Sequence, residues 1–319
     1  MSRVTVTGGC GYVGSVLVPK LLAAGHLVRV LDIGWFGNHL QPHKRLNVNK
    51  IDIRTPNLPI GAADAVIHLA AVANDPTGDL DPKLTWEINA LATMQLADQC
   101  VREGVKQFIY ASSGSVYGVS EEPEVKEDLP LVPLSEYNKT KMVAERVVLS
   151  YTDKMAVQIL RPATVCGFSP RMRLDVAVNN ITMMALTQQK IVIQGGKQIR
   201  PNIHIEDMAD LYLWMLDHPA ITGIYNAGFE NLSIQRIASM VASRLNVRTV
   251  AQPSNDPRSY RLNADKLLAT GFTPRKHVSH AIDEIIAKFR AGELKDESRW
   301  HNLKAMKESP EIAAMRRAA

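Results

Sequence analysis

The apolar positions in the first half of the chain follow two different periods. Short runs rich in β-branched residues, typical of strands buried on both faces, alternate with longer stretches that have helical spacing. The runs predict strands over residues 3–7, 27–32, 64–70, 107–113 and 156–161. The stretches between them predict helices over 12–24, 83–102 and 137–151. This alternation predicts an α/β fold with a parallel sheet that helices cover on both faces.

The second half of the chain has a different pattern. Proline and glycine interrupt residues 166–175 and 193–202, and shorter elements follow them. We expect helices over 176–188, 206–217 and 233–245 and a strand over 223–228. The expected organisation is a large domain over 1–165 with returning segments near 203–228, a smaller C-terminal lobe mainly over 166–290, and a charged helical tail over 291–319. We expect the tail to form a surface or subunit contact.

Composition and charge exclude several classes of protein. Of the 319 residues, 46% are apolar and 22% charged, as in an ordinary soluble globular protein. No run of about 18 apolar residues predicts a membrane span, and the first ten residues resemble a strand rather than a signal core. The formal charge of +5 comes from scattered basic residues, which does not favour nucleic acid as a partner.

The three cysteines give no sign of a metal or disulfide framework. Cys10, Cys100 and Cys166 are an odd number without regular spacing. We therefore expect no metal site and a reducing, cytoplasmic compartment.

A glycine pattern joins the first predicted strand to the first helix. In VTVTGGCGYVGS, Gly8, Gly11 and Gly14 form a G-x-x-G-x-x-G motif in a strand–turn–helix context. Such glycines allow a tight turn and a close approach of the backbone to a pyrophosphate, which the helix N-terminus attracts with free N–H groups. The alternative is a tight turn that binds no ligand.

Acidic residues at strand ends bear on the choice of dinucleotide. Asp32 closes the second predicted strand, where a carboxylate accepts hydrogen bonds from both ribose hydroxyls and repels a 2′-phosphate. Residues 33–35 include no arginine, so NAD is favoured over NADP. Asp52 and Ile53 are candidates to flank the adenine, although a turn at the end of a strand explains Asp52 nearly as well.

Three further residues suggest proton and hydride chemistry. Tyr137 and Lys141 are four residues apart on one face of a predicted helix, for which Ser135 is a plausible cap. A cation near a phenol, with a cationic nicotinamide beside it, is expected to lower the tyrosine pKa. Tyr137 can then take a proton from an alcohol while hydride leaves its carbon, and Ser113 can hydrogen-bond the same oxygen.

With these motifs the sequence resembles the nucleotide-sugar epimerase/dehydratase group of the extended short-chain dehydrogenase/reductases. The resemblance covers almost the whole chain, to about residue 290. It is carried by TGGCGYVGS, Asp32, HLAA (68–71), Asn89, SSGSVYG, YNKTK, LRPATVCG (160–167), RPNIHIEDMAD (200–210) and DPRSYRLNADKLLATGF (256–272). It implies a Rossmann-type domain that binds NAD, a smaller lobe that binds substrate, and redox chemistry at a sugar carbon.

The resemblance and the motifs together assign expected roles. The expected catalytic residues are Ser113, Tyr137 and Lys141. The expected cofactor-binding residues are Gly8, Gly11, Tyr12, Val13, Gly14, Asp32, Asp52, Ile53, Leu69, Ala70, Ala71, Asn89, Tyr137, Lys141, Pro162 and Ala163. The expected substrate-binding residues are Ser113, Thr164, Asn179, Asn180, Arg200 and Arg258. Members of the group often pair the helix that matches residues 87–100, which implies a homodimer.

Departures from the group narrow the expected reaction. Its 4,6-dehydratases have Asp and Glu after the catalytic Ser or Thr, and its decarboxylases also use the Glu, whereas this chain has Gly114 and Ser115. Thr164 stands where epimerases often have Asn. Arg171 and Arg173 either reach a phosphate or carboxylate or lie in a solvated loop.

The expected function is therefore that of a nucleoside-diphosphate-sugar 4-epimerase. A 4-dehydrogenase or 4-reductase uses the same three residues and stays open as the alternative. A reductase for steroid-like or flavonoid-like ketones is disfavoured by Asp32 and by the arginines at 200 and 258. A nucleotide-sensing scaffold that has lost catalysis is disfavoured by the intact serine, tyrosine and lysine.

Overall fold

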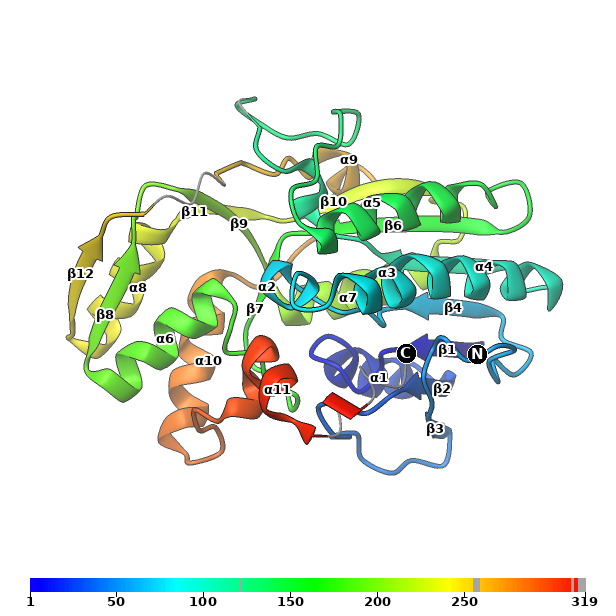
Figure 1. Ribbon diagram of the computed structural model, residues 1–319, viewed down its shortest axis with the longest axis horizontal. Helices are drawn as coiled ribbons and strands as arrows, with labels where there is room; N and C mark the ends of the chain where they lie inside the picture. The colour runs from blue at the N-terminus through cyan, green and yellow to red at the C-terminus, as the bar shows by residue number, and fades with distance from the viewer. Residues whose placement is uncertain (121, 255–258, 311–312, 315–319) are drawn as a thin grey trace.

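The larger lobe is built on a seven-stranded parallel sheet (Figure 1). The computed structural model describes residues 1–120, 122–254, 259–310 and 313–314. The sheet comprises β1 (Arg3–Thr7), β2 (Leu27–Asp32), β3 (Leu46–Lys50), β4 (Ala65–His68), β5 (Gln107–Ala111), β6 (Ala156–Pro162) and β10 (Gly223–Ala227). The strand order is β10-β6-β5-β4-β1-β2-β3, so the winding reverses between β1 and β4. Doubly wound sheets bind ligands at the carboxyl ends of the strands at such a reversal.

Helices cover both faces of this sheet. On one face α1 (Gly14–Ala23) packs against α7 (Ile205–Asp217), and on the other α3 (Pro82–Trp86) and α4 (Ala92–Arg102) pack against α5 (Glu136–Leu149). Neighbouring strand residues point to opposite faces, so β2, β4, β5 and β6 each contribute to two apolar cores. This double burial explains the near-continuous apolar strands of the sequence.

The single helix expected over 83–102 consists of three helical segments. After α3, a π-helical turn spans Glu87–Leu91, and α4 begins at Ala92. Asn89 lies in this turn, and its amide exchanges hydrogen bonds with both the N–H and the C=O of Val72. The π-helical turn is thus the place where the helix is tied to the loop that follows β4.

The smaller lobe combines three helices with two short sheets. Its helices α6 (Ala177–Gln188), α8 (Ile234–Leu245) and α10 (Val278–Arg290) share one apolar core with β8. The sheets are β8 (Lys190–Gln194) with β12 (Arg248–Gln252), and β11 (Glu230–Ser233), β9 (Ile199–His204) and β7 (Thr164–Cys166). These short strands and β3 escaped the sequence analysis, because their mixed polarity gives little periodic signal: every residue of β12 is exposed.

Part of the later sequence returns to the larger lobe. After β9 the chain forms α7 against α1, and β10 then extends the main sheet beside β6. The remaining short elements are α2 (Asp75–Gly78), the 3₁₀ turn η2 (Gly114–Tyr117) and α9 (Asp265–Leu268). Within the described residues, no helix is both long enough and apolar enough to cross a membrane.

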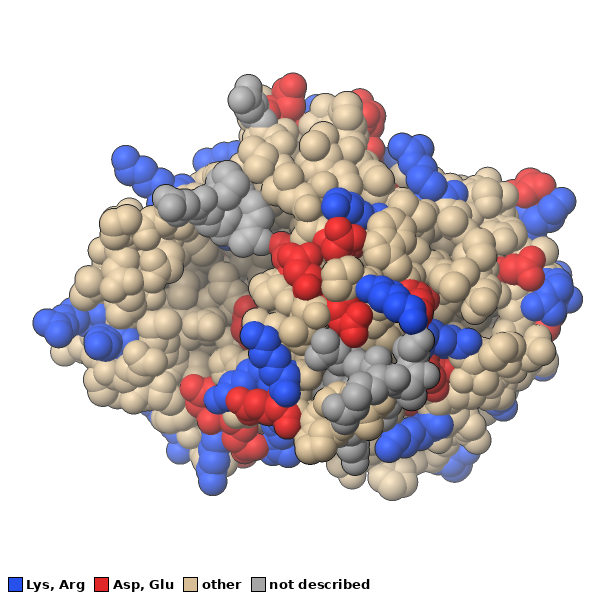
Figure 2. Space-filling view, in the orientation of Figure 1, with Lys and Arg blue, Asp and Glu red and all other residues tan. Residues whose placement is uncertain are grey.

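Charged side chains are mixed in sign on the face shown in Figure 2. Lysine and arginine lie beside aspartate and glutamate on that face rather than in a single basic band. In the part of the chain that the structure describes, no group of three or more His, Cys, Asp or Glu residues is arranged to hold a metal ion.

The C-terminal tail is packed between the two lobes, which differs from the surface role expected for it. It forms η3 (Ser298–Trp300) and α11 (Asn302–Glu308), and α11 contacts α2 of the larger lobe (Figure 1). Trp300 is 6% exposed and Met306 1%. The carbonyl of Trp300 accepts a hydrogen bond of 2.8 Å from the N–H of Leu174, which ties the tail to the loop before α6.

We predict that Trp300→Ala lowers the free energy of unfolding by about 3–5 kcal/mol, because it removes a buried aromatic side chain and leaves a cavity. Denaturant titration would measure this. Leu268→Ala, at a side chain that is 39% exposed, is the control and should change stability by less than about 1 kcal/mol. Equal losses for the two variants would mean that the tail is not an integral part of the fold.

Candidate active site

A cavity of about 810 Å³ lies at the carboxyl ends of the main sheet, where both lobes and the tail meet. It gathers most of the residues expected from the sequence to form the site. Those lining it are Gly8, Gly11, Tyr12, Val13, Gly14, Asp32, Asp52, Ile53, Leu69, Ala70, Ala71, Ser113, Tyr137, Lys141, Pro162, Ala163, Thr164, Asn180 and Arg200. Arg258 lies outside the described residues. Asn89 and Asn179 lie behind the cavity wall.

The glycine loop forms one end of this cavity. Gly8 has φ +72°, and a Cβ there would lie 2.6 Å from the backbone nitrogen of Ala70 in the loop after β4. A Cβ on Gly14 would lie 2.5 Å from the carbonyl oxygen of Gly9. Both positions therefore exclude a side chain, and the loop brings the N-terminus of α1 to the cavity. This cradle fits a pyrophosphate.

Asp32 is held in place by the backbone. One of its carboxylate oxygens accepts the N–H of Cys10 at 2.9 Å and the other accepts the N–H of Gly34 at 2.7 Å. Burial raises the pKa of Asp32, and these two hydrogen bonds oppose that rise. Each oxygen keeps a lone pair for a further donor, so the carboxylate fits the hydroxyls of a ribose.

Asp52 lies in a turn and also on the cavity wall. It accepts the N–H of Arg54 at 2.9 Å and pairs with the Arg54 guanidinium at 2.8 Å, which forms the turn after β3. With Ile53 it also lines the cavity.

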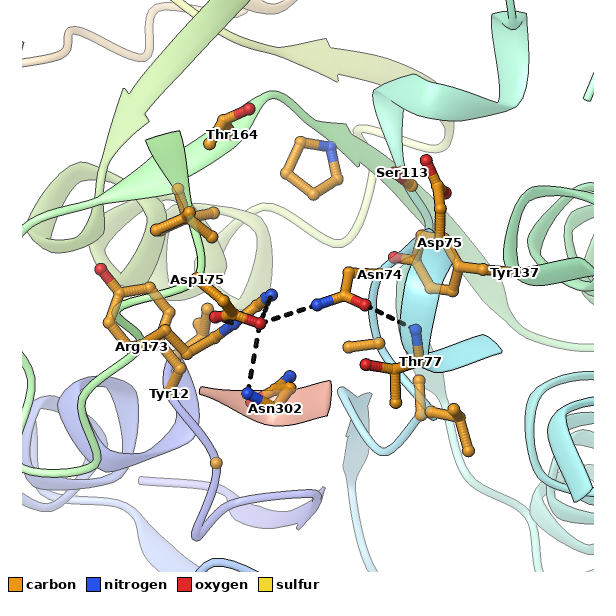
Figure 3. A pocket seen from close by; sticks show the side chains of 18 of the residues that line it. Tyr12, Asn74, Asp75, Thr77, Ser113, Tyr137, Thr164, Arg173, Asp175 and Asn302 are labelled. Atoms are coloured by element: carbon orange, nitrogen blue, oxygen red, sulfur yellow. Dashed lines mark hydrogen bonds and ion pairs between the residues drawn. The ribbon is translucent and has the colours of Figure 1, made fainter. Parts of the chain in front are cut away.

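Ser113, Tyr137 and Lys141 all line the cavity. Ser135 caps α5 by accepting the N–H of Asn138, so Tyr137 and Lys141 lie in its first turns. The Lys141 ammonium donates to the carbonyl of Ala111 at 2.8 Å and lies 6.0 Å from the centre of the Tyr137 ring. Figure 3 shows the Ser113 and Tyr137 side chains side by side.

The pKa of Tyr137 differs from the sequence-based expectation. Burial raises it, while a hydrogen bond with Ser113 and the positive charge of Arg173 oppose the rise. In the protein without a bound nicotinamide, the pKa of Tyr137 is therefore raised, whereas a lowered pKa was expected from the neighbouring Lys141. Lys141 itself is the more perturbed group: burial lowers its pKa to about 7, although the nearby Glu145 carboxylate raises it.

Arg171 and Arg173 are buried, so the solvated loop considered for them does not occur. Arg173 pairs with Asp175 at 3.0 Å, and Asp175 also accepts the Asn74 amide at 2.8 Å and the backbone N–H of Asn302 at 3.3 Å (Figure 3). Arg171 donates to the side-chain oxygen of Asn302 at 2.6 Å. We call Asn74, Arg171, Arg173, Asp175 and Asn302 the polar clasp; it joins the loop after β4, the loop before α6 and the tail.

Sequence analysis singled out the two arginines of the clasp but missed their partners Asn74, Asp175 and Asn302. Because Arg173 and Asp175 are only two residues apart in the sequence, their ion pair could have been suspected from their opposite charges. Asn302 is 127 residues from Asp175, and nothing in its surroundings in the sequence indicates the contact.

Asn89 and Asn179 serve the protein rather than the cavity. Asn89 holds the backbone of Val72, as described above. Asn179 accepts the N–H of Gly167 at 3.0 Å and donates to the Tyr12 hydroxyl at 3.0 Å and to the Arg173 carbonyl at 2.8 Å. Its neighbour Asn180 lines the cavity instead.

Residues 4–228 match the model of the NAD dependent epimerase/dehydratase family. The chain belongs to this family. It is accordingly an NAD-dependent enzyme of the extended short-chain dehydrogenase/reductase type, which confirms the predicted fold class and cofactor.

Named relatives of this family member span several reactions. UDP-glucuronic acid decarboxylase 1 of Danio rerio is 27% identical over 305 residues, 90% of this chain and 72% of the relative. A putative UDP-glucose 4-epimerase of Methanocaldococcus jannaschii is 26% identical over 297 residues, 89% of this chain and 97% of the relative. The solved structure of MoeE5 in complex with UDP-glucose and NAD is 27% identical, with a TM-score of 0.81, covering 91% of this chain and 99% of that one.

We predict that Lys141→Met stabilises the protein in acid while it abolishes activity. The folded-state pKa of Lys141, about 7, is below the usual 10.5, so the folded chain releases a proton that the unfolded chain still holds between these values. The free energy of unfolding should therefore rise with pH from about 7 to 10. Below pH 7 Lys141 is protonated in both states, so the folded protein carries the whole cost of burying its charge. At pH 6 the variant should gain roughly 1–4 kcal/mol.

Denaturant titrations at pH 6 and pH 9 would measure the effect. Lys139→Met, on the exposed side of the same helix, is the matched control and should keep the wild-type pH dependence of stability, because it leaves Lys141 in place. A Lys141→Met variant with the wild-type pH profile of stability would contradict the assignment of a buried, perturbed amine.

Proposed function

We propose that this enzyme is a nucleoside-diphosphate-sugar 4-epimerase. The observation that carries the proposal is the cavity itself, which joins the dinucleotide cradle to Ser113, Tyr137 and Lys141. The named relatives that act on UDP-sugars, and the UDP-glucose in the MoeE5 structure, support this class of substrate.

In this proposal Tyr137 is the proton carrier. It removes the proton of the C4 hydroxyl and later returns it, Ser113 binds the same sugar oxygen, and Lys141 supports the negative charge of the phenolate. NAD, which the glycine loop and Asp32 would hold, would supply a reversible hydride acceptor for C4, so no net oxidation would occur. For inversion the 4-keto sugar presents its other face, while Arg200, and Arg258 as implied by the family resemblance, hold the diphosphate.

The residues after Ser113 argue against elimination and decarboxylation. Gly114 has no side chain, and a Cβ there would lie 3.1 Å from the carbonyl of Pro162. Ser115 is neutral, and its hydroxyl is bonded to Ser113 and Asn138. Neither position supplies an acid or base, so the activity named for the Danio rerio relative does not carry over.

The tail favours epimerisation over net dehydrogenation. Leu303 and Met306 of α11 line the cavity together with Asn302. The tail thus forms part of the cavity wall beside the cofactor cradle, where it would slow exchange of a reduced cofactor and favour return of the hydride to the same sugar. A 4-dehydrogenase would need that exchange at every turnover.

We predict that Tyr137→Phe lowers turnover of the substrate by about 10²–10⁴-fold, the range for loss of general acid–base catalysis. The assay incubates purified protein with a panel of nucleoside-diphosphate hexoses without added cofactor and identifies the products. Tyr151→Phe, outside the cavity, is the control. A ketone product that accumulates and needs an added oxidant would instead identify a 4-dehydrogenase, and unchanged function in Tyr137→Phe would identify a scaffold.

An exposed apolar strip on the larger lobe suggests that the enzyme pairs with a second copy of itself. Trp86, Leu91 and Met94 are 37%, 46% and 40% exposed along α3, the π-helical turn and α4. We propose that this apolar strip pairs with a second copy to form a homodimer. A cytoplasmic location is consistent with three buried, unpaired thiols at Cys10, Cys100 and Cys166.

We predict that Leu91→Glu combined with Met94→Glu converts a dimer into a monomer, because the charges cannot be buried in an apolar contact. Light scattering after size-exclusion chromatography would measure the mass. The control is Val132→Glu, at a side chain 56% exposed on a separate loop, which should leave the mass unchanged. A double variant that stays dimeric would place the interface elsewhere.

A further inference from the structure

One buried cation on the cavity wall is held by uncharged partners. Arg171 is 2% exposed and lines the cavity together with the glycine loop, and its guanidinium lies 3.9 Å from the ring centre of Phe36. The guanidinium donates to the carbonyl of Met172 at 3.2 Å and to the side-chain oxygen of Asn302 at 2.6 Å. Within the described part of the chain, therefore, no carboxylate binds Arg171 directly.

The charges around Arg171 leave it short of a counter-ion. The polar clasp contains two guanidinium groups and one carboxylate, that of Asp175, which Arg173 engages at 3.0 Å. Asp32 is also near enough to raise the pKa of Arg171, but its two oxygens accept backbone N–H groups. Burial and the charge of Arg173 lower the pKa of Arg171 to about 9, so the group is still protonated at neutral pH. A buried cation in this state is stabilised by a bound anion.

The guanidinium of Arg171 also has N–H groups to spare. It carries five of them, and its two hydrogen bonds use one on each terminal nitrogen. A second N–H remains on each terminal nitrogen, and such paired donors suit the oxygens of a phosphate. Nε is buried and has no hydrogen-bond partner among the described residues. The side chain is thus incompletely satisfied by the protein itself.

The position of Arg171 indicates which anion completes its contacts. Its charge is influenced by both Asp32 and Tyr12, so it lies close to the carboxylate that fits the ribose and to the glycine loop. In a bound dinucleotide the diphosphate follows the adenosine ribose and meets the glycine loop. The other diphosphate, that of a nucleotide sugar, is expected at Arg200 in β9 of the smaller lobe.

We propose that Arg171 binds the diphosphate of NAD and that Asn302, in the tail, is the positioning residue that holds its guanidinium there. The Asn302 side chain is 4% exposed, and its backbone N–H is bound to Asp175 at 3.3 Å, so its side-chain oxygen is a fixed acceptor. The tail lies beyond residues 4–228, which match the family model. It therefore adds to the cofactor site a part that the family match does not cover, whichever reaction the sugar undergoes.

The test measures binding and not turnover. The full-length protein, freed of bound nucleotide, is titrated by calorimetry with NAD, ADP-ribose and adenosine. Arg171→Met should weaken NAD and ADP-ribose by about 10–100-fold, as for the loss of a hydrogen bond to a charged group, and adenosine by less than about twofold. Arg171→Lys, which keeps the charge without the planar fork, should lose an intermediate amount.

The same titrations examine the tail. Asn302→Leu should weaken NAD and ADP-ribose by about fivefold, as for the loss of one hydrogen bond that holds Arg171 in place. Lys304→Met, at an exposed position of α11, is the matched control and should bind NAD like the wild type.

A double variant separates positioning from general packing. If Asn302 acts through Arg171, then adding Asn302→Leu to Arg171→Met should weaken NAD by less than about a further twofold. Losses that multiply in full would overturn the role of Asn302. An unchanged NAD affinity in Arg171→Met, or a loss confined to titrations with uridine diphosphate, would overturn the assignment of Arg171. None of these outcomes depends on whether the enzyme epimerises its sugar.

Discussion

The site depends on keeping charged side chains out of water at one edge of a parallel sheet. Asp32, Lys141, Arg171 and Arg173 are all largely buried there, and desolvation is the largest influence on the pKa of each. An unpaired buried charge is strongly destabilising. Each of these groups is therefore held by partners: backbone N–H groups for Asp32, a backbone carbonyl for Lys141, Asp175 for Arg173 and Asn302 for Arg171.

Those partners come from segments that are far apart in the sequence, so the charges also hold the molecule together. The clasp joins the loop after β4, the loop before α6 and the tail around one carboxylate, that of Asp175. Burial lowers the pKa of Arg171 to about 9, and the same guanidinium lies 3.9 Å from the ring centre of Phe36 in the loop after β2. The tail is thus connected to both the reacting centre and the end that fits the adenosine ribose.

The parts of the site that could be predicted are those with local signals. The glycines, Asp32 and the Tyr137–Lys141 spacing each follow from a few neighbouring residues, because strand–turn–helix geometry and helical periodicity are local. The contacts of Asn302 depend on the folded path of the whole chain. The choice between Asn179 and Asn180 depends on the rotation of α6 about its axis, which a pair of identical residues does not reveal.

The pKa of a side chain also depends on the folded structure and not only on its neighbours in the sequence, as Tyr137 shows. A lysine four residues away predicted a lowered pKa, but burial is the largest influence on the phenol and raises its pKa. The contacts of Ser115 likewise become visible only in the structure. From the sequence, Ser115 was notable only as a missing acid; in the structure its hydroxyl joins Ser113 to a buried amide. Relative to the dehydratases, this position therefore lacks an acid and instead carries a hydroxyl that connects Ser113 to Asn138.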